Sequence, residues 1–125
     1  MFRVYDKKRK KFITEDVLMN QNGDLYLVGQ KLLGKKMTLL HQDRYVFQQA
    51  INLNDKDNNP IYIGDYLEAK VAEDRTVRGM VTFAPELSSY IILCFDDEEY
   101  FTLGESVCDL ISIIGNVFDD LKKGK

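Results

Sequence analysis

Apolar and polar residues alternate in short runs along most of the chain, with the period of two that is typical of half-buried β-strands. Near the start, Phe2 and Val4 alternate with polar residues, and apolar residues return at positions 12 and 13. We therefore expect the intervening run KKRKK at the turn of a hairpin, where water reaches every charge. Its members are Lys7, Lys8, Arg9, Lys10 and Lys11.

The Asn-Gly pair at positions 22–23 stands between two apolar runs and gives the clearest hairpin signal in the sequence. Both residue types accept the positive φ angles that a tight primed turn needs. The pattern predicts such a turn, with residues 17–19 paired with residues 25–27 or their neighbours.

The segment between this hairpin and the middle of the chain is less regular. Residues 29–40 contain a Leu-Leu pair, a glycine and lysines, so helix and strand compete there, and strand or loop is favoured. Residues 44–51, RYVFQQAI, are rich in aromatic and β-branched side chains, which predicts a strand.

Residues 52–71 form the segment around which the chain is organised. Asn, Asp and Lys at positions 54–59 have the chemistry of a turn. Pro60 then favours extended geometry in the residue before it, and an apolar triplet at 61–63 can anchor the chain on a core. Gly64 allows a bend before Asp65 begins the next strand.

After Gly64 four short apolar runs, at 66–72, 77–84, 90–95 and 100–103, are separated by short polar connections. Closely spaced strands of this kind predict an antiparallel, strongly bent sheet. Gly79 is a candidate β-bulge where the sheet bends. A last strand is expected over 109–118, with a kink or turn at Gly115 and Asn116.

These elements predict a mainly β protein with little helix. We expect N-terminal hairpins packed on a C-terminal, partly open β-barrel similar to an SH3-like barrel. With 125 residues the chain is expected to be a single domain over 1–125. Its parts are a hairpin lobe over 1–51, a central turn and connection over 52–71, and a barrel lobe over 66–118.

The central segment also resembles the signature of a known family. The residues that carry the resemblance are Leu53, Asp55, Lys56, Ile61, Tyr62, Gly64 and Asp65. Two flanking segments agree, at 2–8 and at 114–118, the second of which includes Gly115 and Asn116. Together they resemble the YopX family, small proteins found mainly in bacteriophages and prophages. The resemblance implies a fold and a phage or prophage origin, and no established biochemical activity.

Two positions depart from the family pattern. The family usually has glycine where Asn52 stands and an Asn-Gly pair at positions 57–58, where this chain has Asp-Asn. Asparagine is the next most permissive residue for positive φ, so we expect both turns to be kept.

Charge is divided unevenly along the chain. The net charge is -3, but residues 1–60 carry a net +4 and residues 61–125 a net -7. This asymmetry is compatible with self-association through opposite charges. No stretch has the roughly 18 to 20 apolar residues of a membrane helix, so we expect a cytoplasmic protein without a membrane partner.

We expect neither a metal nor a cofactor. Asp55, Asp57 and Asn59 imitate the first ligands of a calcium loop, but Pro60 and Tyr66 replace the glycine and the glutamate that such a loop needs. The two cysteines have no metal-site spacing, which predicts free thiols in a reducing compartment.

The sequence disfavours an enzyme, and an enzymatic alternative would need His41 or Asp65 inside a cleft. His41 is the only histidine and no G-x-S-x-G motif supplies a nucleophile, while Asp65 is expected to accept backbone hydrogen bonds at a turn. No glycine-rich phosphate loop is present.

Our leading hypothesis is a non-catalytic binding module of a phage or prophage that acts through an unknown protein partner or as a homo-oligomer. The alternative is nucleic-acid binding by the basic residues 7–11, with Phe2, Tyr5 and Phe12 stacking on bases if they are exposed. The acidic residues at 96–105 and 119–120 could instead fit a basic groove of another protein, but an ordinary solvated face is favoured for them.

Overall fold

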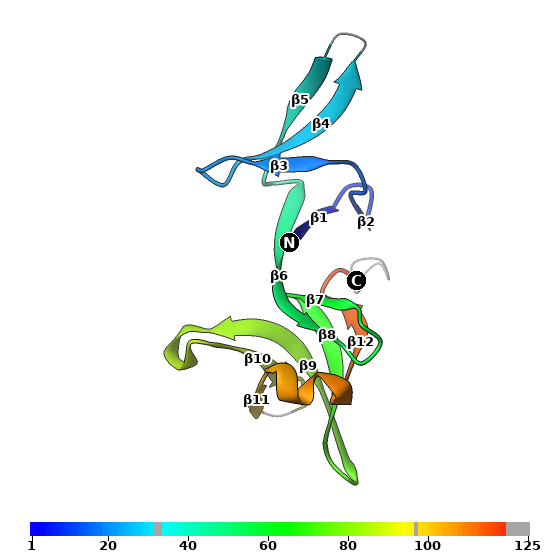
Figure 1. Ribbon diagram of the computed structural model, residues 1–125, viewed down its shortest axis with the longest axis vertical. Coiled ribbons are helices and arrows are strands. Elements are labelled where there is room, and N and C mark those ends of the chain that lie inside the picture. Colours follow the sequence, from blue (N-terminus) through cyan, green and yellow to red (C-terminus); the bar gives the residue numbers. More distant parts are fainter. Residues whose placement is uncertain (32–33, 97, 120–125) are drawn as a thin grey trace. The chain divides into compact units, whose positions relative to one another are not determined.

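The computed structural model describes residues 1–31, 34–96 and 98–119, and almost all of their regular structure is β (Figure 1). The predicted mainly β fold is confirmed. The chain divides into two compact units, Arg3–Phe47 and Met1–Phe2 with Gln48–Lys125. We call these the N-terminal and C-terminal units and describe each by itself. The predicted hairpin lobe ends at residue 51, whereas the boundary between the units falls at residue 47, inside a strand.

A hairpin that carries the basic run begins the N-terminal unit. Strands β1 (Phe2–Asp6) and β2 (Lys11–Phe12) pair antiparallel, with Tyr5 opposite Phe12. The two rings meet edge to face with their centroids 5.1 Å apart. Residues 7–10 form the connecting turn as predicted, whereas Lys11, the last residue of the basic run, begins β2.

The second hairpin belongs to a three-stranded sheet in the order β3-β4-β5. β3 (Val17–Met19) pairs with β4 (Leu25–Lys31) in the predicted register, with Val17 opposite Leu27. The predicted primed turn is wrong, because Gly23 has a positive φ of 86° and Asn22 does not.

The side chain of Asn20 explains the turn that forms instead. Its Oδ1 accepts hydrogen bonds from the N–H groups of Asn22 at 3.0 Å and Asp24 at 2.9 Å. Gly23 N–H also donates to the carbonyl of Asn20 at 3.1 Å. The asparagine therefore satisfies the loop from within, and only the glycine has to adopt positive φ.

The strand alternative for residues 29–40 is confirmed for the residues that the structure describes. β4 pairs with β5 (Gly34–Leu40) from Leu25–Leu40 out to Lys31–Gly34. The Leu-Leu pair at 32–33 lies outside the described residues. Because β3 pairs only with residues 25–27, the outer part of this hairpin is a two-stranded ribbon (Figure 1).

The next strand, β6 (Tyr45–Asn54), confirms the strand predicted for 44–51 and extends it by three residues. In the C-terminal unit β6 pairs with β7 (Pro60–Tyr62), and the register shifts between Ala50 and Asn54. Asn52 lies in this irregularity with a φ of 64°, and Asn58 in the following turn has a φ of 65°. Both asparagines thus hold the left-handed backbone that the family gives to glycine, as predicted.

The larger part of the C-terminal unit is a five-stranded antiparallel sheet. Its order is β11-β10-β9-β8-β12. The bounds are β8 (Asp65–Ala72), β9 (Arg75–Ala84), β10 (Ser89–Cys94), β11 (Tyr100–Thr102) and β12 (Ile111–Asn116). β9 bends along its length (Figure 1). The predicted bent antiparallel sheet is confirmed, and its likeness to an SH3-like barrel stays a prediction.

One face of this sheet carries the hydrophobic core. The core side chains come from alternate positions of the strands, as period two requires. Those of this sheet that are almost completely buried are Leu67, Val81, Ile92 and Ile111, and Ile61 of β7 belongs to the same core cluster.

Gly79 does not form the predicted bulge. It stays in register with Leu67 on β8 and with Cys94 on β10. A Cβ atom at this position would collide with the backbone carbonyl of Leu93. Glycine is needed because two backbones approach each other closely, which the sequence does not distinguish from a bulge.

The final strand begins later than predicted. Residues 109–110 lie in a 3-10 helix, η2 (Glu105–Leu110), and β12 starts at Ile111. A second 3-10 helix, η1 (Pro85–Leu87), joins β9 to β10. The predicted kink at Gly115 is confirmed as a register shift between Ile113 and Gly115.

Candidate functional site

The basic turn, which we define as residues 7–11, presents five cationic side chains to water. All five residues are exposed. The backbone of the turn is fixed at both ends, because Lys7 N–H donates to the carbonyl of Arg44 at 2.9 Å and Lys10 N–H to that of Asp6 at 2.8 Å. Lys10 has a φ of 57°, an uncommon conformation for a residue with a Cβ.

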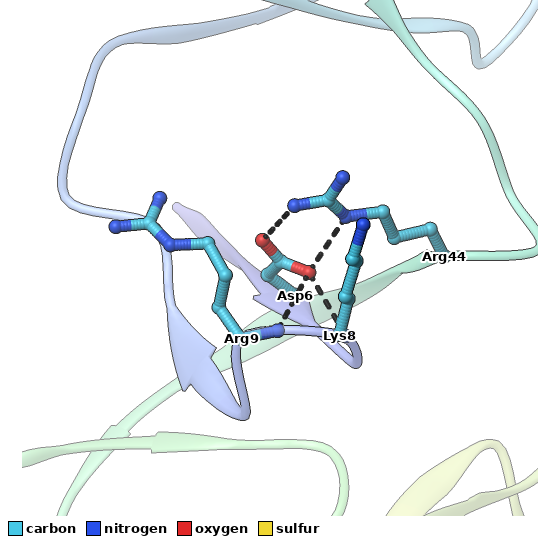
Figure 2. A network of polar contacts seen from close by, with 4 residues as sticks. All are labelled: Asp6, Lys8, Arg9 and Arg44. Carbon is cyan, nitrogen blue, oxygen red and sulfur yellow. Dashed lines mark hydrogen bonds and ion pairs between the residues drawn. The ribbon is translucent and has the colours of Figure 1, made fainter.

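The carboxylate of Asp6 lies between the Arg44 side chain and the backbone of this turn (Figure 2). Only 1% of the residue is exposed. Its Oδ1 accepts hydrogen bonds from the N–H groups of Lys8 at 3.0 Å and Arg9 at 3.3 Å. Two peptide groups of the turn are therefore held by one buried carboxylate, which limits the conformations of the loop.

Arg44 supplies the opposite charge for that carboxylate. Its Nε donates to Oδ1 of Asp6 at 2.9 Å and its Nη2 to Oδ2 at 2.8 Å, a bidentate pair (Figure 2). This hydrogen-bonded pairing holds the pKa of Asp6 far below its ordinary value and raises the pKa of Arg44. The charge of Asp6 is compensated by Arg44, so it does not neutralise the cations of the turn.

Two of the three aromatic residues near the turn are engaged with one another. Tyr5 is completely buried and packs against Phe12, so it does not meet the condition of exposure under which stacking on a base was expected. Phe12 and Phe2 are half-buried. The guanidinium of Arg3 lies 4.3 Å from the centre of the Phe12 ring. The turn thus offers charge to a partner rather than a row of exposed rings.

Asp55, from the family signature, ties the central turn to the last strand. Its Oδ1 accepts from the N–H groups of Asp57 at 3.0 Å and Asn59 at 2.9 Å, and its Oδ2 from that of Ile113 at 3.2 Å. Burial raises the pKa of Asp55, but the hydrogen bonds from Asn59, Ile113 and Asp57 lower it by more, and the net pKa lies below its ordinary value. Both oxygens of the Asp55 carboxylate therefore accept hydrogen bonds from backbone N–H groups.

Lys56 is an exposed neighbour of this turn. Its N–H donates to the carbonyl of Ile111 at 2.9 Å. Its side chain lines a polar depression of about 260 Å³ in the C-terminal unit together with Glu68, Lys70 and Asp109. This depression gathers charges of both signs, and Glu68 is already paired with Arg78 at 2.8 Å.

Asp65 accepts a backbone hydrogen bond at a turn, as predicted. It is 1% exposed, and its Oδ2 accepts from the N–H of Tyr62 at 2.8 Å. Gly64 between them has a φ of 95°, and a Cβ there would collide with the side chain of Gln48. Ile61 of the family signature is completely buried. His41, the other residue considered for catalysis, is exposed.

The end of the signature has its own local bonds. Asn116 N–H donates to Oδ2 of Asp119 at 2.9 Å, and Oδ1 of Asn116 accepts from the N–H of Phe118 at 2.9 Å. A Cβ at Gly115 would meet the same Asp119 carboxylate. These hydrogen bonds stabilise the turn that follows Gly115 and Asn116 at the end of β12.

The sequence did not single out an uncovered apolar face on the three-stranded sheet, which we call the N-sheet patch. One row across the strands joins Leu18, Tyr26 and Leu39, and the next row joins Val28 and Met37. Residues directly opposite on paired strands share a face, as do residues two apart on one strand. Leu18 is 52% exposed, Leu39 43% and Met37 52%.

The C-terminal unit has a second such face, the C-sheet patch, on the outer side of the five-stranded sheet. Residues of four strands form one row in the register of the sheet, and the ring of Phe95 lies 5.0 Å from one of them. Its members are Tyr66, Met80, Leu93, Phe95 and Tyr100. Leu93, Phe95 and Tyr100 are exposed, and the loop between β10 and β11 beside them contains the exposed acids Asp96, Glu98 and Glu99.

The prediction of free cysteines is confirmed. Cys94 is buried, and Cys108 is half-buried with a pKa raised by burial. Within residues 1–31, 34–96 and 98–119 no group of three or more possible metal-binding side chains gathers. No helix in the same part of the chain has the length and apolar character to cross a membrane.

Comparison with known proteins places the chain in a family. No curated protein matches it. Two solved structures share the fold: protein yopX from Bacillus subtilis, with a TM-score of 0.65 and 14% identity, and protein EF1440 from Enterococcus faecalis, with a TM-score of 0.54 and 16% identity. The match to yopX covers 94% of this chain and 92% of the yopX chain. The match to EF1440 covers 99% of this chain and 96% of the EF1440 chain. The YopX protein family model matches residues 1–122, and the chain therefore belongs to the YopX family.

Proposed function

We propose that this chain is a non-catalytic binding module encoded by a phage or prophage, and that it works in the host cytoplasm by associating with further copies of itself. Membership in the YopX family supports the phage or prophage origin. The observation that carries self-association is the pair of uncovered apolar faces, the N-sheet patch and the C-sheet patch.

Contiguous apolar surface of this kind is a mark of protein contact sites. Charge adds a reason for a second copy as the partner. The N-terminal unit carries ten basic and five acidic side chains, a net +5, and the C-terminal unit carries seven basic and fifteen acidic, a net -8. Opposite charges on the two units speed the encounter of two copies and favour contacts between unlike units.

The non-catalytic part of the proposal rests on how the buried carboxylates are used. Asp6 is bound to Arg44 and to the backbone of the basic turn. Asp55 and Asp65 accept backbone hydrogen bonds. General acid or base catalysis needs a carboxyl group whose pKa is moved toward neutrality, whereas Asp6 and Asp55 are shifted the opposite way.

Crosslinking of an isotope mixture tests self-association directly. Equal amounts of ordinary and nitrogen-15-labelled protein are mixed and treated with a carbodiimide, which joins amines to carboxylates without a spacer. Crosslinked peptide pairs that combine both isotopes, with lysines of the N-terminal unit joined to acids of the C-terminal unit, support the proposal. If every crosslinked pair carries a single isotope, the copies do not associate.

A second candidate function, nucleic-acid binding, is favoured by the basic turn. Its five exposed cations sit on a backbone fixed by Asp6, so little backbone freedom is lost when they meet phosphates. Such contacts release counterions, and the affinity then falls steeply with salt. The net -8 of the C-terminal unit opposes this function.

Fluorescence anisotropy with a labelled DNA and a labelled RNA tests this candidate. We compare the wild type with a triple variant, Lys8→Ala, Arg9→Ala and Lys10→Ala, across a salt series. The expected result is a slope of log affinity against log salt that falls by about 2 to 3 in the variant, about 0.7–0.9 for each lost phosphate contact. A matched triple variant at exposed cations of the C-terminal unit, Lys56, Lys70 and Arg78, controls for net charge. Equal loss in both variants would show general charge attraction and count against the turn.

A further inference from the structure

Neither β3 nor the outer ribbon of β4 and β5 has a covered outer face in the part of the chain that the structure describes. Val28 N–H still donates to the carbonyl of Asp16 at 2.9 Å, and farther out the described part of the ribbon consists of two strands that bond to each other. A two-stranded ribbon is marginally stable in water and gains stability when an apolar face is packed against another surface. The N-sheet patch is such a face, since Met37 and Val28 on the ribbon continue the row formed by Leu18, Tyr26 and Leu39.

The surface that fits this patch has to be apolar and acidic. The segment from β3 to β5, residues 17–40, contains three lysines and one acid, Asp24. The whole N-terminal unit carries a net +5, so an identical patch of a second copy would bring like charges together. Packing of the N-sheet patch on itself is thereby disfavoured.

The C-sheet patch has the required character. Leu93 is 42% exposed, and Tyr100 and Phe95 beside it are exposed as well. The adjoining loop contributes the exposed carboxylates of Asp96 and Glu98, whereas the neighbouring Glu99 pairs with Arg75, and the unit as a whole carries a net -8. Apolar surface therefore meets apolar surface, and a unit of net positive charge meets a unit of net negative charge, which favours the encounter of these two faces.

We infer that the N-sheet patch of one copy docks on the C-sheet patch of a second copy. This inference rests on the proposed function and specifies which surfaces meet. Because the two patches differ, the contact is heterologous: each copy offers one patch to the copy before it and the other to the copy after it. Repetition of such a contact produces a closed ring or an open filament.

Three glutamate variants with matched exposure test the inference. Leu39→Glu places a charge in the N-sheet patch, where the leucine is 43% exposed, and Leu93→Glu places one in the C-sheet patch at 42%. Leu87→Glu is the control, because Leu87 is 44% exposed on η1 and belongs to neither patch. Circular dichroism and thermal melting establish that each variant is folded.

Size-exclusion chromatography with light scattering is run from about 1 µM to about 1 mM protein. We expect the wild type and Leu87→Glu to associate and the other two variants to remain monomeric. When the two monomeric variants are mixed, the intact C-sheet patch of Leu39→Glu meets the intact N-sheet patch of Leu93→Glu. The mixture should form dimers of one copy each that do not grow further.

Each other outcome overturns the inference in a different way. A monomeric wild type removes the proposed self-association itself. An associated wild type whose association survives both patch variants places the interface elsewhere. Two monomeric variants whose mixture stays monomeric exclude a heterologous contact between these patches. If either variant fails to fold, Met37→Glu or Tyr100→Glu takes its place in the same mixing experiment.

Discussion

Arg44 forms a bidentate ion pair with Asp6 across 38 residues of sequence, and the same carboxylate holds two N–H groups of the basic turn. The aspartate side chain is 2% exposed and the arginine side chain 37%. The buried carboxylate of Asp6 at the end of β1 therefore bonds both to Arg44, directly before β6, and to the backbone of the basic turn.

Removal of this pair should destabilise the N-terminal unit. In Asp6→Asn the Arg44 guanidinium loses its anionic partner and the turn loses part of its anchor, a far larger effect than loss of an exposed pair. Glu68→Gln, which breaks the exposed pair with Arg78, is the matched control. Urea unfolding should show a drop in the free energy of unfolding for Asp6→Asn that is several times that of the control. Equal effects would contradict the structural role of Asp6.

Acid should weaken the fold through the two carboxylates with lowered pKa values, Asp6 and Asp55. A group whose pKa is lower in the folded state contributes stability above its unfolded pKa, about 3.9 for aspartate, and loses that contribution as pH falls toward the folded pKa. The difference in unfolding free energy between wild type and Asp55→Asn should thus be largest at pH 7 and shrink below about pH 4. A difference that does not change with pH would contradict this assignment.

Gly79 should tolerate no larger residue. In Gly79→Ala the new Cβ collides with the carbonyl of Leu93, and we expect a loss of about 1–3 kcal/mol in unfolding free energy, as in other overpacked sites. Gly104→Ala is the control, because nothing lies within 4 Å of a Cβ there. The control should stay within about 0.5 kcal/mol of wild type. Similar effects at both positions would argue against the close approach.

Asn52 and Asn58 should behave as substitutes for glycine. Both have φ near 65°, which costs an ordinary L-residue about 1–2 kcal/mol. Asn52→Ala should therefore destabilise the protein by about 1 kcal/mol, while Asn52→Gly should remain within about 0.5 kcal/mol of wild type. Thermal unfolding of the two variants distinguishes them, and a glycine variant as weak as the alanine variant would show that the side chain, rather than φ, matters.

Local chemistry explains which parts of the fold could be predicted from sequence. The basic hairpin, the strands at 44–51 and after Gly64, and the positive φ values of Asn52 and Asn58 follow from period two and from the conformational preferences of single residues. The primed turn predicted at 22–23 does not form, because the side chain of Asn20, outside the Asn-Gly pair, accepts the hydrogen bonds of the loop.

Features that depend on the register between strands could not be predicted. Gly79 lies against Leu93 only because β9 and β10 pair at that offset. The ion pair of Asp6 likewise needs Arg44 from a distant segment. Both apolar patches appear only once the strands are aligned, although apolar residues at consecutive positions in 25–28 were a signal that both faces of that strand are apolar.

Sedimentation velocity of the unmodified protein tests the central claim of self-association most directly. The protein is measured over a range of concentrations, at low salt and at about 1 M salt, where the Debye length falls to about 3 Å. Self-association between unlike units predicts a sedimentation coefficient that rises with concentration and a rise that is weaker at high salt. A single monomeric species at every concentration, at either salt, would contradict it.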